Sequence, residues 1–216
     1  MSESTTRKQD PGIIVDRGLA YGVERVHGVN PVLLIEKILR ERIMDSLYWQ
    51  KDCVPLNLLS LIDEIVLHLR LLGTYSNVAK TRPTRFICLT LKLLSLQPST
   101  EIIDYLLVQR DFKYLSAFAA LYIRVTRSSV EVYERLEPLL KDGRKLNFYE
   151  GGAAFVTHID EFIDGLLNKE KFCDLMLPRL IDREQLEDRE LLEPRESEIQ
   201  SEFEEEVERE EEGLKD

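Results

Sequence analysis

The most constraining feature of the sequence is a stretch from Leu115 to Val125 that is apolar on nearly every side when it is placed on a helix. A surface helix needs only one apolar face, so a helix that is apolar all round must be covered by other elements. Small residues within the stretch, such as Ser116 and Ala117, allow neighbouring backbones to come close. The sequence therefore predicts a central helix, from about Phe112 to Val125, inside a larger helical domain.

Apolar residues at three- and four-residue spacing predict further helices around the central one. Several of these helices begin at residues that suit a helix start, and Pro138 predicts a kink or a restart in one of them. The expected helix starts are Asn30 with Pro31, Asn57, Pro83, Ser99 and Ser128, and a last helix follows His158. Alternating strand patterns are missing, so the sequence predicts an all-α fold built as a single compact multi-helix domain.

Glycines give two expectations about how these elements are connected. Gly73 follows Leu72 in the pattern of the second helix, which predicts that the helix continues to Leu72 and is capped by the glycine. Residues from Gly143 to Thr157 are interpreted as a long interior loop with a flexible point at Gly151 and Gly152.

Charge is distributed unevenly along the chain. The 216 residues carry a net charge of -11, but Asp182–Asp216 alone has 17 acidic and 5 basic residues, leaving 23 acidic and 24 basic residues in the rest. This composition predicts three parts: a flexible N-terminal arm over 1–25, a helical domain over 26–181, and an acidic tail over 182–216. Repulsion between like charges favours a solvated helix or a disordered segment for the tail.

Several classes of protein are excluded by what the sequence lacks. The longest apolar run, Ala117–Ile123, is much shorter than the roughly 20 residues of a membrane-spanning helix. The three cysteines lie far apart and the three histidines are scattered, so neither a disulfide framework nor a zinc site is predicted. Phosphate-binding and nucleophile motifs are absent. We therefore expect no enzymatic activity, no cofactor and no metal, and a reducing compartment.

A few residues are candidates for contact with a partner. Asp160, Glu161 and Asp164 form one acidic stripe on a predicted helix, although a solvated face would have the same pattern. Arg82 and Arg85 form a basic group at a helix start, and they too could simply be solvated. Tyr48 and Trp49 follow a helix and could anchor a partner, although an aromatic pair at this place also suits the core.

Direct binding of RNA is the alternative function that the sequence leaves open. Basic residues gather in three small groups, and each could contact phosphate or pair with the chain's own acids. The groups are Lys80, Arg82 and Arg85; Arg124 and Arg127; and Lys141, Arg144 and Lys145. Exposed aromatic residues for base stacking are not interleaved with them, which weakens this interpretation.

Long motifs in the sequence resemble the pre-mRNA-splicing factor 38 family. They run in order from about Val26 to Arg195, and a fungal member of the family would fit. The motifs are VHGVNPVLLIEKILRERIMDSLYWQKDC (Val26–Cys53), RPTRFICLTLKLL (Arg82–Leu94), DFKYLSAFAALYIRVT (Asp111–Thr126), YERLEPLLKDGRKL (Tyr133–Leu146), THIDEFIDGLL (Thr157–Leu167) and LPRL (Leu177–Leu180). The acidic tail departs from the arginine-serine tail of some members.

This resemblance implies a non-enzymatic splicing factor in the nucleus. It implies a helical protein-binding scaffold in the tri-snRNP or the precatalytic spliceosome, needed for spliceosome activation. The implied partners are a splicing factor of the microfibrillar-associated-protein type, a zinc-finger splicing factor and other tri-snRNP components. Association with RNA is then expected to be indirect.

Overall fold

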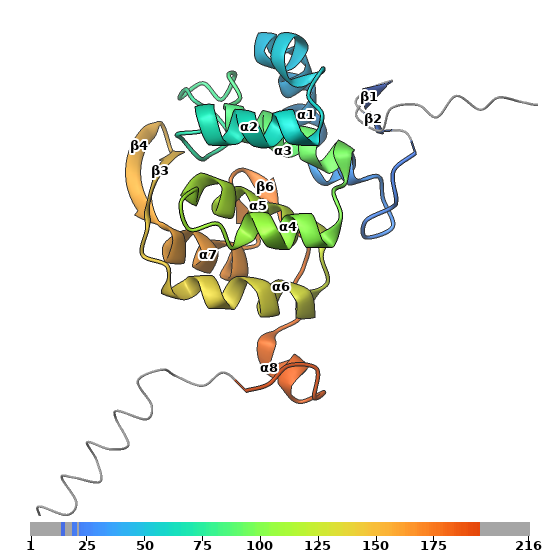
Figure 1. Ribbon diagram of the computed structural model, residues 1–216, viewed down its shortest axis with the longest axis vertical. Helices are drawn as coiled ribbons and strands as arrows, with labels where there is room; N and C mark the ends of the chain where they lie inside the picture. The colour runs from blue at the N-terminus through green and yellow to red at the C-terminus, as the bar shows by residue number, and fades with distance from the viewer. Residues whose placement is uncertain (1–13, 16–18, 21, 195–216) are drawn as a thin grey trace, which may run out of the picture. The chain divides into compact units, whose positions relative to one another are not determined.

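The computed structural model describes residues 14–15, 19–20 and 22–194, drawn as a coloured ribbon in Figure 1. These residues divide into two units, with the boundary between Leu180 and Ile181. The first unit is predominantly helical, which confirms the predicted fold class. Most of the predicted N-terminal arm and the acid runs near the end of the tail lie outside the described residues.

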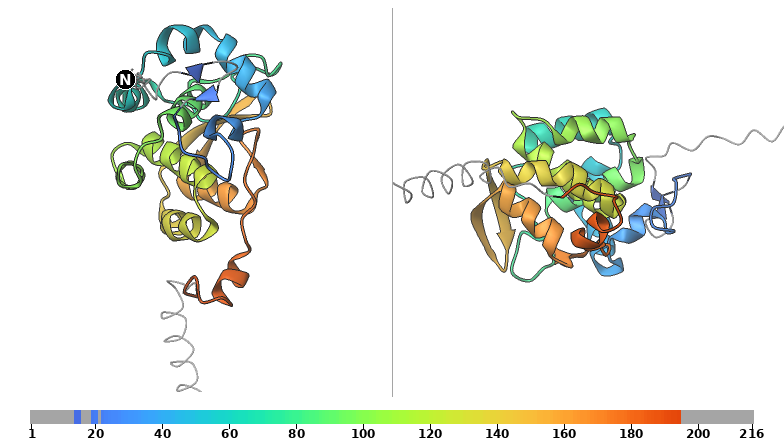
Figure 2. Two further views of the ribbon diagram at one scale, coloured as in Figure 1. Left: turned by 90° about the vertical axis from the view of Figure 1, so that its right-hand side faces the viewer. Right: turned by 90° about the horizontal axis from the view of Figure 1, so that it is seen from below.

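Helix α5 (Lys113–Thr126) is the central element of the first unit, as predicted. Every residue from Tyr114 to Val125 is buried. Helices α2 (Leu58–His68) and α3 (Arg85–Leu96) lie on one side of α5, and α6 (Ser129–Leu136) and α7 (Ile159–Asn168) lie on the other (Figures 1 and 2). Helix α4 (Thr100–Leu107) also packs directly against α5.

Local capping chemistry explains where α2, α3 and α6 begin. The Asn57 side chain accepts from the Ser60 amide and the Ser128 side chain from the Glu131 amide, so both predicted starts are confirmed. Thr84, immediately after the predicted Pro83, caps α3. After α6 the chain continues as the 3₁₀ turn η3 (Glu137–Lys141), which is the restart expected from Pro138.

The first predicted helix is divided in two. Asn30 caps only a 3₁₀ turn, η1 (Pro31–Leu34), and α1 (Lys37–Asp45) begins after an extended stretch. The break is held by the Arg40 guanidinium, whose Nη1 donates to the Ile35 carbonyl at 3.0 Å. It also lets both Val32 and Ile35 point into the core, where they are fully buried. The π-helical turn η2 (Trp49–Cys53) follows α1.

The prediction of a loop over Gly143–Thr157 and of a chain without strands is wrong. Strands β3 (Lys145–Glu150) and β4 (Ala153–His158) form an antiparallel hairpin in this region. Gly151 and Gly152 make its two-residue turn with φ of 62° and 95°, values that glycine adopts at little cost. Leu146 and Phe148 alternate into the core, which fixes the register of the hairpin.

The second helix also ends earlier than predicted. Helix α2 stops at His68, and the next residues run extended so that the Leu72 amide donates to the Asn147 carbonyl of β3. Gly73 has φ of 111°, and a Cβ on it would lie 2.3 Å from the Tyr149 carbonyl oxygen. Gly73 therefore permits a close approach of two backbones and does not cap the helix.

Short pairs of strands complete the described elements of the first unit. Strands β1 (Ile14–Val15) and β2 (Leu19–Ala20) pair near the N-terminus, and β5 (Lys171–Phe172) pairs with β6 (Leu175–Met176) after α7. The Phe172 ring lies 5.2 Å from that of Phe162, centroid to centroid. In the second unit, α8 (Arg183–Glu187) has an ion pair between its first and last residues.

Candidate protein-binding surface

An apolar groove opens between α2, α4 and the start of α5. It consists of two hollows of about 370 and 320 Å³ that share Val66, Phe112 and Leu115. Most of the groove surface is formed by apolar side chains from three elements, namely Ile62, Val66, Ile102, Tyr105, Phe112 and Leu115. We call this surface the apolar groove.

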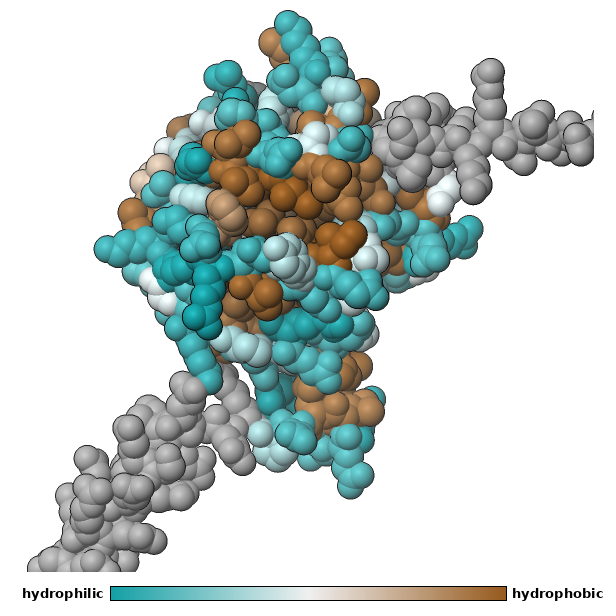
Figure 3. All heavy atoms as spheres, in the orientation of Figure 1, coloured by the Kyte–Doolittle hydropathy of each residue, from teal (hydrophilic) through white to brown (hydrophobic). Residues whose placement is uncertain are grey.

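The groove exists because α2 and α4 carry apolar residues on more than one face. On α4, Ile103 and Leu106 are buried in the core, yet Tyr105 on the outer side is 66% exposed. On α2, Leu61 and Ile65 point into the core while Ile62 and Val66 line the groove. Figure 3 shows the resulting hydrophobic patch over the α2 and α4 region. Contiguous exposed apolar patches of this kind mark surfaces where other proteins bind.

A third hollow, of about 390 Å³, lies beside the C-terminal end of α2 and the start of α3. Its charged or aromatic lining residues are Tyr48, His68, Arg70, Arg82 and Arg85, and no carboxylate is among the lining residues. We call this surface the basic groove. Because α2 supplies side chains to both, the two grooves follow the same helix.

Hydrogen bonds and ion pairs organise the basic groove around Glu64 of α2. The Tyr48 hydroxyl donates to Glu64 Oε1 at 2.9 Å, and Arg85 Nη1 lies 3.8 Å from the same oxygen. The Arg85 guanidinium stands over the Tyr48 ring at 5.3 Å. Partial burial, together with the nearby Cys53 and Glu64, raises the pKa of Tyr48 above its ordinary value, so its hydroxyl remains a donor at neutral pH.

The structure brings three of the seven candidate residues together. Tyr48, Arg82 and Arg85 all line the basic groove, although they come from distant parts of the sequence. Trp49, in contrast, is only 5% exposed and belongs to the core. Of the two interpretations of this aromatic pair, the core position therefore applies to Trp49, whereas Tyr48 lines the basic groove.

The acidic stripe on α7 lines neither groove. Two of its three carboxylates accept hydrogen bonds from residues within α7 or just before it. Glu161 accepts hydrogen bonds from the Thr157 hydroxyl at 2.6 Å and from the His158 amide at 3.1 Å, which lowers the pKa of this carboxyl. Asp164 accepts from the Asn168 side chain at 2.7 Å. Asp160 is half-buried, and its Oδ1 has no hydrogen-bond partner among the described residues.

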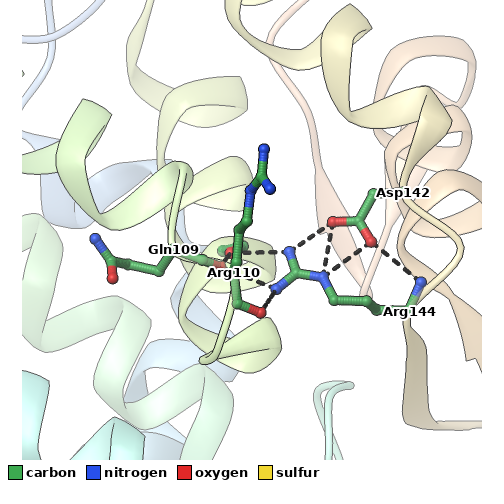
Figure 4. Close-up of polar contacts among 5 residues, drawn as sticks. Gln109, Arg110, Asp142 and Arg144 are labelled. Atoms are coloured by element: carbon green, nitrogen blue, oxygen red, sulfur yellow. Dashed lines mark hydrogen bonds and ion pairs between the residues drawn. The ribbon is translucent and has the colours of Figure 1, made fainter.

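Two of the basic groups considered for RNA binding hold their key arginines inside the protein. Arg124 is buried, donates to the Leu166 and Pro178 carbonyls at 2.7 Å, and has its pKa lowered to about 10 by that burial. Arg144 pairs with Asp142 and donates to the Gln109 and Arg110 carbonyls (Figure 4). Both guanidinium groups are engaged in contacts within the protein, which weakens the interpretation of these groups as RNA-binding patches.

The Asp142–Arg144 pair also stabilises the edge of the apolar groove. Arg144 donates a hydrogen bond to the carbonyl of Gln109, and Gln109 lines that groove. We expect Asp142→Asn to cost about 1–3 kcal/mol at pH 7, since it weakens charge-assisted hydrogen bonds. Burial alone would raise the pKa of Asp142, but the hydrogen bonds from Arg144 outweigh it and lower the pKa. Asp142 therefore contributes to the unfolding free energy at pH values above its pKa in the unfolded chain, about 3.9. This contribution is lost as the pH falls through the lower pKa that Asp142 has in the folded protein.

Urea unfolding of the wild type and the Asp142→Asn variant between pH 7 and pH 3 measures this difference. The gap in unfolding free energy should be widest at neutral pH and should shrink below about pH 4. Asp63→Asn is a matched control, because the Asp63 side chain is exposed and makes no hydrogen bond or ion pair with the described residues. A gap that stays constant with pH would contradict the assigned role of Asp142.

Sequence patterns alone do not identify the apolar groove, or Arg70 and His68 as groove residues. The sequence does contain one indication of the apolar groove: Ile102 and Tyr105 lie on the outer side of an otherwise amphipathic helix. Among the described residues there is no cluster of three or more metal-binding side chains, and no helix there is long and apolar enough to cross a membrane.

Comparison with known proteins extends these observations. Residues 24–190 match the model of the PRP38 family. The chain is 49% identical over 164 residues to pre-mRNA-splicing factor 38 of Schizosaccharomyces pombe, covering 76% of this chain and 77% of that protein. It is 42% identical over 163 residues to human pre-mRNA-splicing factor 38A, covering 75% of this chain and 52% of the human protein. The chain therefore spans about half the length of the vertebrate relatives that it matches.

A solved structure gives the same answer for the fold. A chain in the crystal structure of the Snu23-Prp38-MFAP1(217-258) complex of Chaetomium thermophilum is similar with a TM-score of 0.79 and 41% identity. The similarity covers 87% of the present chain and 98% of that chain. With the family model matching most of its length, the chain belongs to the PRP38 family of pre-mRNA-splicing factors, which are not enzymes.

Proposed function

We propose that this chain acts in the nucleus as a protein-binding scaffold of the spliceosome, in the tri-snRNP or the precatalytic particle, where it supports activation. The observation that carries this proposal is the apolar groove, which a rigid helical domain presents between α2 and α4. Grooves of this kind bind amphipathic helices, whose apolar side chains at i, i+3, i+4 and i+7 fill the hollow.

The similar structure supports a specific set of partners. That structure holds a Prp38 chain together with Snu23 and a short MFAP1 fragment. By similarity, we propose that the present chain binds the equivalent zinc-finger splicing factor and the equivalent microfibrillar-associated-protein-type factor. Two partners on one domain would make the chain a bridge between them.

Tyr105 is the residue to change first, because it is a large aromatic side chain that projects into the apolar groove from the outer side of α4. We expect Tyr105→Ala to weaken binding of at least one of the two partners by tenfold or more, which is typical of an aromatic anchor at an interface. Isothermal titration calorimetry of the purified chain with each purified partner measures the change.

A matched control separates this effect from general loss of exposed apolar surface. Leu47 is 64% exposed and lines neither groove, so Leu47→Ala should leave both affinities within about twofold. If the wild type binds neither partner, the proposed scaffold role is wrong. If it binds both and Tyr105→Ala behaves like the control, the scaffold uses another surface.

A further inference from the structure

The apolar groove and the basic groove form one continuous surface. Arg70 lines the 320 Å³ hollow of the apolar groove and also the basic groove. Its Nη1 donates to the Val66 and Leu69 carbonyls at the end of α2, so its position is fixed by the helix itself. A segment that leaves the apolar groove at the C-terminal end of α2 therefore reaches the arginines of the basic groove.

Charge changes in a definite direction along this surface. The end formed by Arg70, Arg82 and Arg85 has no carboxylate in its lining, although Glu64 reaches Arg85 from α2. The opposite end of the apolar groove includes Glu101, and the hollow between the two ends includes Asp111 and Lys113, whose charges are opposite. An occupant therefore meets mainly positive charge at the basic end and negative charge at the other end, which favours one orientation.

The two arginines at the basic end differ in their availability. The Arg85 guanidinium is held in place by the Tyr48 ring and by Glu64. Arg82 is exposed, and its guanidinium makes no hydrogen bond or ion pair with the described residues. Arg82 is thus ready to pair with an incoming carboxylate, and Arg85 is positioned beside an aromatic ring that can contact an apolar stem.

On the basis of the proposed scaffold function, we propose that one segment of a partner protein occupies both grooves. Its apolar face fills the groove between α2 and α4, and acidic residues at one end of the same segment pair with Arg82 and Arg85. Ile62 and His68 lie about 9 Å apart along the α2 axis but on different sides of that helix, so the segment passes the C-terminal end of α2 at Arg70.

An acidic protein segment fits this surface better than RNA does. Outside the tail the chain is close to neutral, with 24 basic and 23 acidic residues, so it offers no extended positive field to a phosphate backbone. The basic groove, at about 390 Å³, accommodates a few side chains, and Tyr48 is the aromatic residue in its lining. An RNA backbone has no apolar side chains to fill the adjoining apolar groove, whereas a protein helix can carry both apolar and acidic side chains.

The test is a double charge reversal, Arg82→Glu with Arg85→Glu, measured with the partner whose binding depends on Tyr105. Fluorescence anisotropy of that labelled partner should show at least a tenfold loss of affinity. The wild-type affinity should also fall as salt rises from 50 to 500 mM, and this dependence should be much reduced in the double variant. Lys51→Glu with Lys145→Glu is the matched control, since it changes the net charge equally at exposed positions outside the grooves.

Each outcome has a separate meaning. Equal affinities for the double variant and the control would overturn the inference while leaving the scaffold function in place. Absence of binding by the wild type would remove the scaffold function itself. A 20-nucleotide single-stranded RNA serves as the competing probe: if it binds the wild type, displaces the partner and is lost on the double reversal, the basic groove is an RNA site and the inference is wrong.

Discussion

Gly73→Ala is expected to destabilise the domain by about 3 kcal/mol or more, through backbone strain combined with a steric clash. The φ of Gly73 is 111°, which L-residues with a Cβ rarely adopt, and the added Cβ would lie 2.3 Å from the Tyr149 carbonyl oxygen. That oxygen belongs to the backbone of β3 and cannot rotate away as a flexible side chain would. The bridge between Leu72 and β3 must therefore move or break.

Thermal and urea unfolding of the variant measure this cost. Gly143→Ala is the matched control, because nothing lies within 4 Å of the Cβ that it would add, and its φ is ordinary. The control should remain within about 0.5 kcal/mol of the wild type. Equal stability of the two variants would mean that the chain does not approach β3 at Gly73 as described.

Arg124→Met is expected to cost about 2–4 kcal/mol, because it leaves one buried and one partly buried carbonyl without a donor. Arg124 is buried in α5 and donates to the Leu166 carbonyl from Nε and to the Pro178 carbonyl from Nη1, each at 2.7 Å. Leu166 lies in the last turn of α7, where carbonyls lack partners within the helix. The arginine therefore fastens both α7 and the segment after β6 to the central helix.

The control for this variant is Arg110→Met, which removes an arginine side chain that is exposed. It should change the unfolding free energy by no more than about 0.5 kcal/mol. Because Met keeps the length and apolar stem of the replaced side chain, a large loss in Arg124→Met can be assigned to the missing hydrogen bonds. A loss as small as that of the control would show that water satisfies the two carbonyls instead.

Helix starts and the central helix could be predicted because their causes are local. Asn57 and Ser128 place a side-chain acceptor beside free amides, and this geometry depends only on residues three positions apart. The apolar run around Ala117 required burial wherever it lay. The end of α2 could not be predicted in this way, because Leu72 leaves the helical path to pair with Phe148 of β3, 76 positions later.

The hairpin of β3 and β4 shows a different limit. Its alternating pattern is short, and Gly151 followed by Gly152 was interpreted as flexibility although two glycines also suit a tight hairpin turn. The register is fixed by packing of Phe148 against Phe162 and Phe172, which are distant in sequence. A pattern that depends on distant partners gives only a weak signal in the sequence itself.

The candidate site was predicted only in part, for a related reason. Arg82 and Arg85 were identified as a basic group, but Tyr48 joins them only because η2 and α3 pack together. The apolar groove requires outward side chains of α2 and α4 to face the same space, which depends on how both helices pack on α5. Sequence patterns identified the faces of single helices, and tertiary packing determined which faces meet.

Binding of partners in the grooves beside α2 is tested most directly by backbone amide chemical shifts measured by NMR. The ¹⁵N-labelled chain is titrated with each purified partner, and shift changes are mapped onto the structure. We expect that, for at least one partner, the largest changes cluster at 62–70, 82–85 and 102–115. Large changes confined to α6 and α7, with the groove residues unaffected by either partner, would contradict it.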